Sequence, residues 1–363
     1  MLEIIFIIIF SLYFIQLVLF TIGASKSFPK RAGDDLPSAT VVVAARNEEK
    51  NIGECLKALD KLIYPKDKLE IIVINDHSTD KTDEIINDFI KDKPNFKKII
   101  PSKQIGKVKG KANAIANALE IAKGEIILTT DADCVVSPTW AKTIASYYTK
   151  DVAMVCGYTN QKADTVFEGM QDVDFIYLLA VASGAMNLGK PLSAIGNNMS
   201  YRKDVYFEVG GYEAIPFSVT EDFKLLMAIH NLKKYKIIYP TDADALVTSA
   251  PCPDAKTLYW QKKRWGVGGL DSDLAGFTAM ATAWLTHLGI LLAPFLVPQV
   301  AVYLIGFKFI SDYFFLYGVY RKLNIKLSIK YFLVFEIYFI FYVLVLPVLL
   351  IFTKKVNWKG RKY

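Results

Sequence analysis

The sequence predicts an α/β domain with a mostly parallel central sheet, joined to apolar segments towards both ends of the chain. Short β-branched runs alternate with helical patterns from Ser38 onward, an order typical of parallel strands covered by helices on both faces. The composition is too apolar for a water-soluble domain, because 53% of the 363 residues are hydrophobic and the mean hydropathy is +0.27. We therefore expect part of the chain to lie in a membrane.

The first segment, residues 1–23, is expected to form a transmembrane anchor. Its apolar run over residues 2–22 has Glu3 as its only charge and is long enough to cross a hydrocarbon core of about 30 Å. A signal peptide is the alternative, but the run is longer than a signal core and lacks a basic start. By the positive-inside rule, the basic residues that follow predict a cytoplasmic location for the next domain. They are Lys26, Lys30 and Arg31.

The net charge and the cysteines argue against other classes of protein. The formal charge of +7 is concentrated in the membrane flanks and the tail, so we expect contact with anionic lipid and no nucleic-acid partner. The cysteines lack paired metal-ligand spacing and fit a reducing cytosol, which predicts neither a disulfide nor a zinc site. They are Cys55, Cys134, Cys156 and Cys252.

Residues 38–255 are expected to form the cytoplasmic α/β domain. Strands are predicted at 39–45, 69–74, 97–100 and 125–130, and helices at 51–62, 81–90 and 112–123. Polar loops follow three of these strands, at 46–49, 76–80 and 131–133. Because parallel strands end at the same edge of a sheet, we expect these loops to converge there and form the site.

Asp131 and Asp133 stand at the end of the fourth predicted strand, separated by one residue. Alternate side chains of an extended backbone point the same way, so both carboxylates share a face. Such hard oxygen donors suit Mg²⁺ or Mn²⁺, and a cation held by one or two carboxylates keeps positions open for substrate phosphates. The pattern therefore suits a binding site for a metal-bound nucleotide diphosphate.

The second half of the domain is less regular. A strand is expected at 151–158, a long amphipathic helix at 166–186, and a strand with a turn at 195–202 beneath the site. A further helix starts with Thr220 as its cap and carries Glu221 and Asp222 in its first turn. Acidic residues in a first turn often do no more than complement the helix dipole. Both a structural and a chemical role are therefore open for Glu221 and Asp222.

Residues 256–273 are expected to form an interfacial amphipathic helix. Helical spacing places Gln261, Arg264 and Trp265 on one face, with Lys262 and Lys263 facing elsewhere. Tryptophan and lysine side chains at that depth are also typical of a helix lying among lipid headgroups.

Residues 274–353 are expected to form a C-terminal transmembrane region of two to three spans. The stretch 274–304 provides one long span or two short ones around its prolines, and 331–352 is a clear span. Between them, 307–320 is interrupted by Lys308 and Asp312.

The orientation of these spans stays open. Both the loop at 321–330 and the tail at 354–363 are basic, and a single span between them cannot leave both inside. Either 307–320 lies in the interface or one basic segment is outside.

Six motifs in order resemble the signature of membrane-bound members of glycosyltransferase family 2. This group includes cellulose, chitin and hyaluronan synthases and ceramide glucosyltransferase. The motifs are VAARNEE at 43–49, NDHSTD at 75–80, GKANA at 110–114, DAD at 131–133, TED at 220–222 and QKKRW at 261–265, so the resemblance covers roughly residues 38–266. It implies a Rossmann-like GT-A fold, a nucleotide-diphosphate-sugar donor with a bias to UDP, and inversion at the anomeric carbon to give a β-glycoside.

The resemblance also implies roles on the donor side. Glu48 and Asp76 match positions that hold the nucleoside, where carboxylates accept hydrogen bonds. Lys111 matches a basic residue near the nucleotide. Asp133 matches the direct metal ligand, with Asp131 also in the metal-binding pair and nearer the ribose or donor sugar. The metal assists the leaving diphosphate as a Lewis acid.

On the acceptor side, Asp222 matches the general base that inversion requires. Glu221 is expected to shape the acceptor pocket. Arg264 suits the departing diphosphate, Trp265 offers a ring face for a sugar, and Gln261 offers a hydrogen-bond partner.

These matches favour a multi-pass enzyme of the cytoplasmic membrane that moves a sugar from a nucleotide diphosphate to a lipid hydroxyl. The stretch at 197–202 matches polymerising relatives only loosely, and the ending at 358–363 is similar to tails of bacterial lipid-modifying members. A processive polysaccharide synthase with a growing glycan as acceptor is the alternative within the class. A catalytically inactive membrane scaffold is the alternative from another class, although such a protein need not keep both Asp133 and Asp222.

Overall fold

The computed structural model describes residues 1–31, 33, 35–216, 218–358 and 361–362. Its contacts divide the chain into two compact units. The sheet unit comprises Ser27–Asn160 and Ser193–Ala250, and the helical unit comprises Met1–Lys26, Gln161–Leu192 and Pro251–Tyr363. The expected boundary at residues 38–255 stays a prediction, and the structure differs from it in grouping residues 161–192 with the apolar helices.

A seven-stranded sheet forms the centre of the sheet unit within its described residues, in the order β3-β2-β1-β4-β8-β6-β9. The strands are β1 (Ala39–Ala45), β2 (Leu69–Asn75), β3 (Phe96–Ile99), β4 (Ile126–Asp131), β6 (Val152–Cys156), β8 (Met199–Arg202) and β9 (Lys236–Ile238). Only β8 runs antiparallel to its neighbours, and all the other pairs in this sheet are parallel. The expectation of an α/β fold with a mostly parallel sheet is therefore confirmed.

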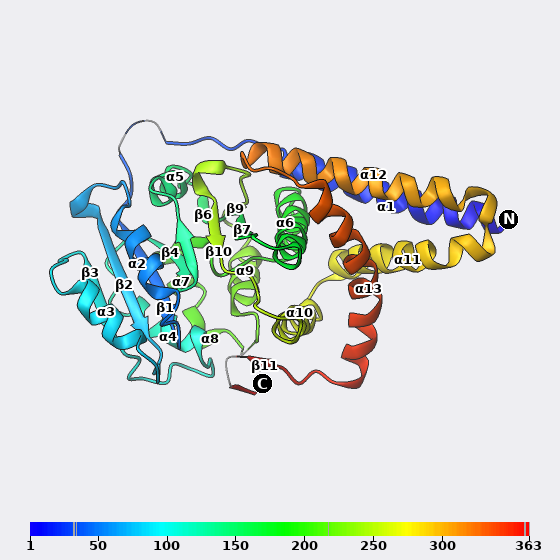
Figure 1. The fold of residues 1–363 in the computed structure, drawn as a ribbon. Coiled ribbons are helices and arrows are strands. Elements are labelled where there is room, and N and C mark those ends of the chain that lie inside the picture. Colours follow the sequence, from blue (N-terminus) through cyan, green and yellow to red (C-terminus); the bar gives the residue numbers. More distant parts are fainter. Residues whose placement is uncertain (32, 34, 217, 359–360, 363) are drawn as a thin grey trace. The chain divides into compact units, whose positions relative to one another are not determined.

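The strands are apolar because helices cover both faces of the sheet. Val41, Val43, Ile71 and Val73 are fully buried, as parallel strands require. The helices of this unit are α2 (Ile52–Asp60), α3 (Thr82–Ile90), α4 (Lys111–Leu119), α5 (Trp140–Ser146), α7 (Lys203–Glu208), α8 (Gly211–Ala214) and α9 (Glu221–Asn231), and the short turns are η1 (Lys66–Lys68) and η2 (Ala243–Ala245). Figure 1 shows the strands of the sheet with α2 and α4 beside them.

A small second sheet fixes the backbone just beyond Asp133. It consists of β5 (Cys134–Val136), β10 (Val247–Ser249) and β7 (Thr159–Gln161), in the order β5-β10-β7. Ser249 pairs with Cys134, and the amide of Ala250 donates to the carbonyl of Asp133 at 3.2 Å. The residues after β4 are therefore held between two sheets.

The helical unit consists of long, mostly apolar helices. They are α1 (Leu2–Ala24), α6 (Val166–Asn187), α10 (Ala255–Gly269), α11 (Leu274–Leu296), α12 (Pro298–Lys322) and α13 (Ile329–Phe352). A short hairpin of β11 (Asn357–Trp358) and β12 (Arg361–Lys362) follows them. Figure 1 shows α1, α11 and α12 side by side, and each pair of the three is in contact.

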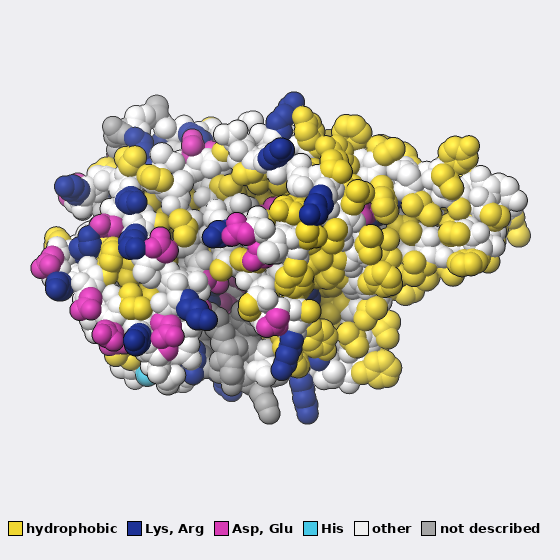
Figure 2. Space-filling view, viewed as in Figure 1, with side chains coloured by type: hydrophobic (Ala, Val, Ile, Leu, Met, Phe, Trp, Pro, Cys, Tyr) yellow, Lys and Arg dark blue, Asp and Glu magenta, His cyan; other side chains and the backbone are white. Residues whose placement is uncertain are grey.

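Four of these helices are long and apolar enough to cross a membrane, among the residues that the structure describes: α1, α11, α12 and α13. Figure 2 shows hydrophobic side chains gathered over this part of the surface. Leu274, Phe295, Val302 and Phe352 are each more than three-quarters exposed there, which is costly in water and favourable in lipid.

The stretch at 307–320, which polar residues interrupt in the sequence, lies within the continuous helix α12. Pro298 stands in the first turn of α12, where its missing amide costs nothing, so α11 ends before it and a new helix begins. Lys308 and Asp312 do not break α12, because both are fully buried and form an ion pair of 2.7 Å one turn apart. Lys308 also pairs with Glu336 on α13.

The helix α6 differs from its expected amphipathic character, because it is buried on almost every side. Its start is fixed by a capping box, in which Thr165 and Glu168 bond to each other's backbone amides. A Cβ at Gly184 would come within 2.6 Å of the Cα of Phe20, so α1 and α6 cross at a distance that only glycine permits. Close packing against α1, α12 and α13 replaces the exposed face.

Candidate active site

The carboxyl ends of β1, β2 and β4 lie at one edge of the sheet. In the parallel register Ala45 pairs with Asn75, and Ala44 pairs with Asp131. The loops at 46–49, 76–80 and 131–133 therefore leave the sheet side by side. This is the edge at which open α/β sheets bind their ligands.

The first two loops hold each other in a strained conformation. Asn47 and His77 have φ angles of 53° and 54°, a region that residues other than glycine rarely adopt. Asn47 accepts a hydrogen bond from the amide of Thr79 at 2.8 Å, and its own amide donates to Ser78 Oγ at 3.1 Å. These reciprocal hydrogen bonds offset the cost of the strained backbone. They also fix the two loops that carry Glu48 and Asp76.

Glu48 and Asp76 are both buried at this edge, 6% and 7% exposed. The Glu48 carboxylate accepts from Asn51 Nδ2 at 2.8 Å, and its backbone amide donates to Thr82 Oγ1 at 2.8 Å. Arg46 donates to the carbonyl of Asp76 at 2.8 Å. The two carboxylates predicted to hold the nucleoside are therefore carried by an ordered pair of loops.

Two buried thiols lie beneath Asp131 and Asp133. Cys55 Sγ is 3.5 Å from the carbonyl of Asp131, and Cys134 Sγ is 3.5 Å from Asp133 Oδ1. Burial raises the pKa of both thiols, and the carboxylates of Asp133 and Asp131 raise it further. Both thiols are therefore neutral at physiological pH and unsuited to hold a metal ion.

Lys111 forms an ion pair with Asp131. It is the first residue of α4 and follows Gly110, whose φ of 58° lets the chain turn sharply into the helix. Burial lowers the pKa of Lys111, but the carboxylates of Asp131, Glu221 and Asp222 outweigh it and raise the pKa above its ordinary value. The side chain keeps its positive charge while about a third of it (32%) stays exposed.

Asp222 is tied to the same edge through Gly196. The amide of Gly196 donates to Asp222 Oδ2 at 2.9 Å, and the carbonyl of Gly196 accepts from Thr129 Oγ1 on β4 at 2.8 Å. A Cβ on Gly196 would lie 3.4 Å from Lys111 Nζ and 3.5 Å from Asp222 Oδ2, so the lysine and the carboxylate are near neighbours. Thr220 occupies the cap position of α9, but its side chain makes no capping hydrogen bond.

The structure thus gathers Asp131, Glu221 and Asp222 within electrostatic reach of Lys111. Sequence reasoning placed residues 195–202 beneath the site but did not identify Gly196 as the link between Asp222 and β4. Gly196 stands in the GNN stretch at 196–198, which matches none of the six motifs. The sequence therefore did not indicate that Gly196 contacts Asp222.

The remaining predicted residues lie on α10 in the helical unit, and their relation to the carboxylates stays a prediction. They are Gln261, Arg264 and Trp265. The two lysines expected to face elsewhere on α10 are buried, because Lys262 and Lys263 are 3% and 2% exposed. Lys262 is buried by an ion pair with Asp174 on α6, a partner far away in the sequence.

The donor set at Asp131 and Asp133 fits a cation that shares its coordination with a ligand. Within the described part of the chain, no three His, Cys, Asp or Glu side chains are gathered as a complete metal site. Two carboxylates alone are the set that Mg²⁺ and Mn²⁺ use when substrate phosphates and water complete the coordination.

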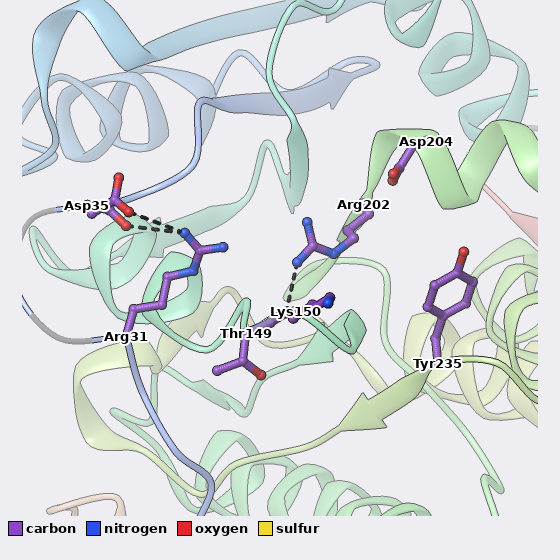
Figure 3. Close-up of a pocket in the computed structure, with 7 residues that line it drawn as sticks. All are labelled: Arg31, Asp35, Thr149, Lys150, Arg202, Asp204 and Tyr235. Carbon is purple, nitrogen blue, oxygen red and sulfur yellow. Dashed lines mark hydrogen bonds and ion pairs between the residues drawn. The ribbon is translucent and has the colours of Figure 1, made fainter.

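A basic hollow lies on the sheet unit at the edge away from the candidate site. At this edge the first residue of β4, Ile126, pairs with Arg202. Figure 3 shows the residues that line it, which are Arg31, Asp35, Thr149, Lys150, Arg202, Asp204 and Tyr235. Arg31 donates to the carbonyl of Tyr148 at 2.6 Å, and Arg202 donates to those of Val152 and Thr149, both at 2.8 Å. These arginines hold the chain, and the hollow is separate from the candidate site.

Comparison with solved structures defines the class of fold. The mannosyltransferase PcManGT from Pyrobaculum calidifontis, solved in complex with GDP-Man and Mn²⁺, aligns with a TM-score of 0.60 and 20% sequence identity. The alignment covers 89% of this chain and 99% of that one. The expected GT-A fold of glycosyltransferases is confirmed.

The sequence defines the family within that class. Residues 40–221 match the model of the family described as "Glycosyl transferase family 2", and the chain belongs to this family. The expected membership of glycosyltransferase family 2 is therefore confirmed.

Curated relatives match most of the chain at moderate identity. The "Probable glycosyltransferase YdaM" of Bacillus subtilis is 29% identical over 250 residues, which is 64% of this chain and 56% of the relative. The β-monoglucosyldiacylglycerol synthase of a Nostoc species is 28% identical over 256 residues, which is 67% of this chain and 51% of the relative. The chain thus matches about half the length of these relatives.

The buried thiols give a prediction about chemical reactivity. Because burial and the neighbouring carboxylates raise the pKa of Cys55 and Cys134, neither forms a thiolate at pH 8 in the folded protein. We expect Ellman's reagent to react slowly with the native protein and rapidly after denaturation. Fast native labelling of Cys55 or Cys134, identified by peptide mass, would contradict this arrangement.

Proposed function

We propose that this protein is an inverting membrane glycosyltransferase that transfers a sugar from a nucleotide-diphosphate donor, with UDP as the expected carrier, to a lipid hydroxyl. The observation that carries the proposal is the grouping of Lys111, Asp131 and Asp222 at the carboxyl edge of the sheet in a family 2 chain. The similarity to a β-monoglucosyldiacylglycerol synthase and the four apolar helices support a lipid acceptor.

The donor would bind across the carboxyl ends of β1, β2 and β4. Glu48 and Asp76 would accept hydrogen bonds from the nucleoside, and Lys111 would face the nucleotide with its retained positive charge. Asp133 would be the direct ligand of Mg²⁺ or Mn²⁺, with Asp131 nearer the ribose or donor sugar. A bound cation would neutralise charge on the leaving diphosphate. The Mn²⁺ present with GDP-Man in the mannosyltransferase complex supports a divalent cation here.

The transfer would proceed as one displacement. The acceptor oxygen forms a bond to the anomeric carbon while the bond from that carbon to the diphosphate oxygen breaks. The hydroxyl proton passes to the carboxylate of Asp222, and the bonding electron pair leaves with the diphosphate. The hydrogen bond from Gly196 to Asp222 Oδ2 orients this carboxylate, and the link of Gly196 to Thr129 ties it to β4.

Residues of α10 would complete the acceptor side. Arg264 has a fixed fork of donors suited to the departing diphosphate. Gln261 and Trp265 would contact the acceptor, and Glu221 would shape its pocket. The proposed location is the cytoplasmic membrane, with the sheet unit on the cytoplasmic side where nucleotide sugars are available.

The function is tested by the product that membranes form from labelled nucleotide sugars. We expect the wild-type protein to yield one chloroform-soluble glycolipid. Asp222→Asn keeps the shape of the side chain but removes the base, so the rate should fall by about 10²- to 10⁴-fold. Asp204→Asn, a matched carboxylate outside the candidate site, is the control that should keep wild-type activity.

Three outcomes would contradict this proposal. A labelled glycan of high molecular weight would indicate a polysaccharide synthase. Undiminished transfer by purified Asp222→Asn would exclude this residue as the base, and absence of any transfer across a panel of donors would favour the inactive scaffold.

The metal assignment gives a separate prediction. Asp133→Ala removes the proposed direct ligand, so Mn²⁺ should no longer strengthen UDP binding measured by calorimetry. Asp204→Ala is the control, because Asp204 lines the hollow at the other edge of the sheet and lies outside the candidate site. Equal Mn²⁺ dependence in Asp133→Ala and the wild-type protein would show that the metal binds elsewhere.

A further inference from the structure

An ion pair that the proposed mechanism does not use lies in the helical unit. Lys262 on α10 and Asp174 on α6 are paired with side chains 4% and 1% exposed. Burying two charges is costly, and removing one partner leaves the other uncompensated. Such a pair contributes little to stability but constrains geometry strongly, because moving either side chain away would leave the other charge buried without its partner.

The lysine of this pair also lies over the indole of Trp265. Lys262 Nζ is 4.4 Å from the centroid of that ring, close enough for a cation–π attraction. The indole stacks on Phe175, the residue after Asp174, with centroids 5.5 Å apart and planes inclined by 10°. Two consecutive residues of α6 are therefore linked to Trp265, Phe175 by direct stacking and Asp174 through Lys262.

Buried hydrogen bonds join α6 to neighbouring helices and so fix the position of Asp174. The hydroxyl of Tyr177 is 2.7 Å from that of Tyr13, and Tyr13 donates to Asp312 on α12 at 2.8 Å. Nearer the start of α6, Asp172 accepts from Tyr320 on α12 at 2.8 Å. These buried bonds join α6 to α1 and α12.

The helix α10 has little freedom to withdraw from this arrangement. A Cβ at Gly266 would come within 2.8 Å of Leu346 Cδ2 and 3.0 Å of Leu350 Cδ1, so α10 lies close against α13. Lys262 Nζ also lies 5.1 Å from the ring centroid of Tyr342 on α13. The backbone of α10 is thus constrained by packing against α13.

We propose that the Asp174–Lys262 ion pair is the positioning device for Trp265, and that it holds the partly exposed indole in the orientation in which it receives the acceptor. This inference rests on the proposed function, which takes Trp265 as a contact of the acceptor. Asp174 and Lys262 are positioning residues, because they act through Trp265 and not on the reacting atoms.

The double variant Asp174→Asn/Lys262→Met separates positioning from stability. It removes both charges together and leaves neither buried alone, while methionine keeps a side chain of similar length against the indole. The full-length protein in lipid nanodiscs is studied by NMR, with the indole N–H resonance of Trp265 assigned through Trp265→Phe.

We expect the double variant to unfold near the wild-type temperature but to show a shifted or broadened Trp265 resonance. Its KM for the lipid acceptor should rise by at least about fivefold, the effect of losing a cation–π contact of moderate strength. Its KM for the nucleotide sugar should stay within about twofold of the wild-type value, because the donor site is built on the sheet unit.

Lys263→Met is the matched control on the same helix. Lys263 is equally buried, but its ammonium lies over the rings of Tyr259 and Trp260 at 5.9 and 5.3 Å and not over Trp265. This variant should leave the Trp265 resonance unchanged. If the double variant fails to fold, Asp174→Glu keeps both charges paired but lengthens the acidic side chain by one methylene, and it should shift the Trp265 resonance by a smaller amount.

An unchanged Trp265 resonance in the charge-free variant would overturn the inference, whatever the enzymatic activity. A shifted resonance with a wild-type acceptor KM would also overturn it. If the wild-type protein transfers no sugar to lipid, the proposed function fails, and the resonance alone still decides whether the ion pair orients the indole.

Discussion

The parallel pairing of β4 with β1 is the constraint on which the candidate site depends. It brings Asp131 beside Ala44, so the carboxylates after β4 emerge next to the two interlocked loops after β1 and β2. The same strand carries Thr129, which holds Gly196 and through it Asp222. A register shift of one residue would turn these side chains to the other face of the sheet. The proposed donor-binding carboxylates and the proposed base are therefore both positioned by β4.

Charge is handled differently in the two units. In the sheet unit, Lys111 is partly exposed among several carboxylates and keeps a charge that a ligand can meet. In the helical unit, Lys262 and Lys308 are buried and each is matched by carboxylates on neighbouring helices. Buried pairs of this kind add little stability but select one arrangement of helices. The first pattern suits binding, and the second suits the alignment of apolar elements that could otherwise slide.

Sequence reasoning predicted features whose signals are local. The β-branched strands, the DAD motif and the apolar segments towards both ends of the chain each lie within a short window, and the fold and the family are confirmed. Features that depend on distant partners were not visible. Helical spacing placed Lys262 on a different face from Arg264 and Trp265, but it could not show the ion pair with Asp174, which lies 88 residues away in the sequence. Lys308 and Asp312 looked like an interruption because the sequence does not show that they bury their charges together and that Glu336 on another helix also pairs with Lys308. The roles of the site residues stay predictions.

The most direct test of this account is the anomeric configuration of the product. Proton NMR of the glycolipid formed from an α-linked UDP-sugar reports which face of the anomeric carbon the acceptor attacked. A single displacement, with Asp222 as base opposite the diphosphate held at Asp131 and Asp133, predicts a β-glycoside. An α-glycoside would contradict it, because retention requires a different sequence of bond changes from the one that this arrangement of carboxylates supports.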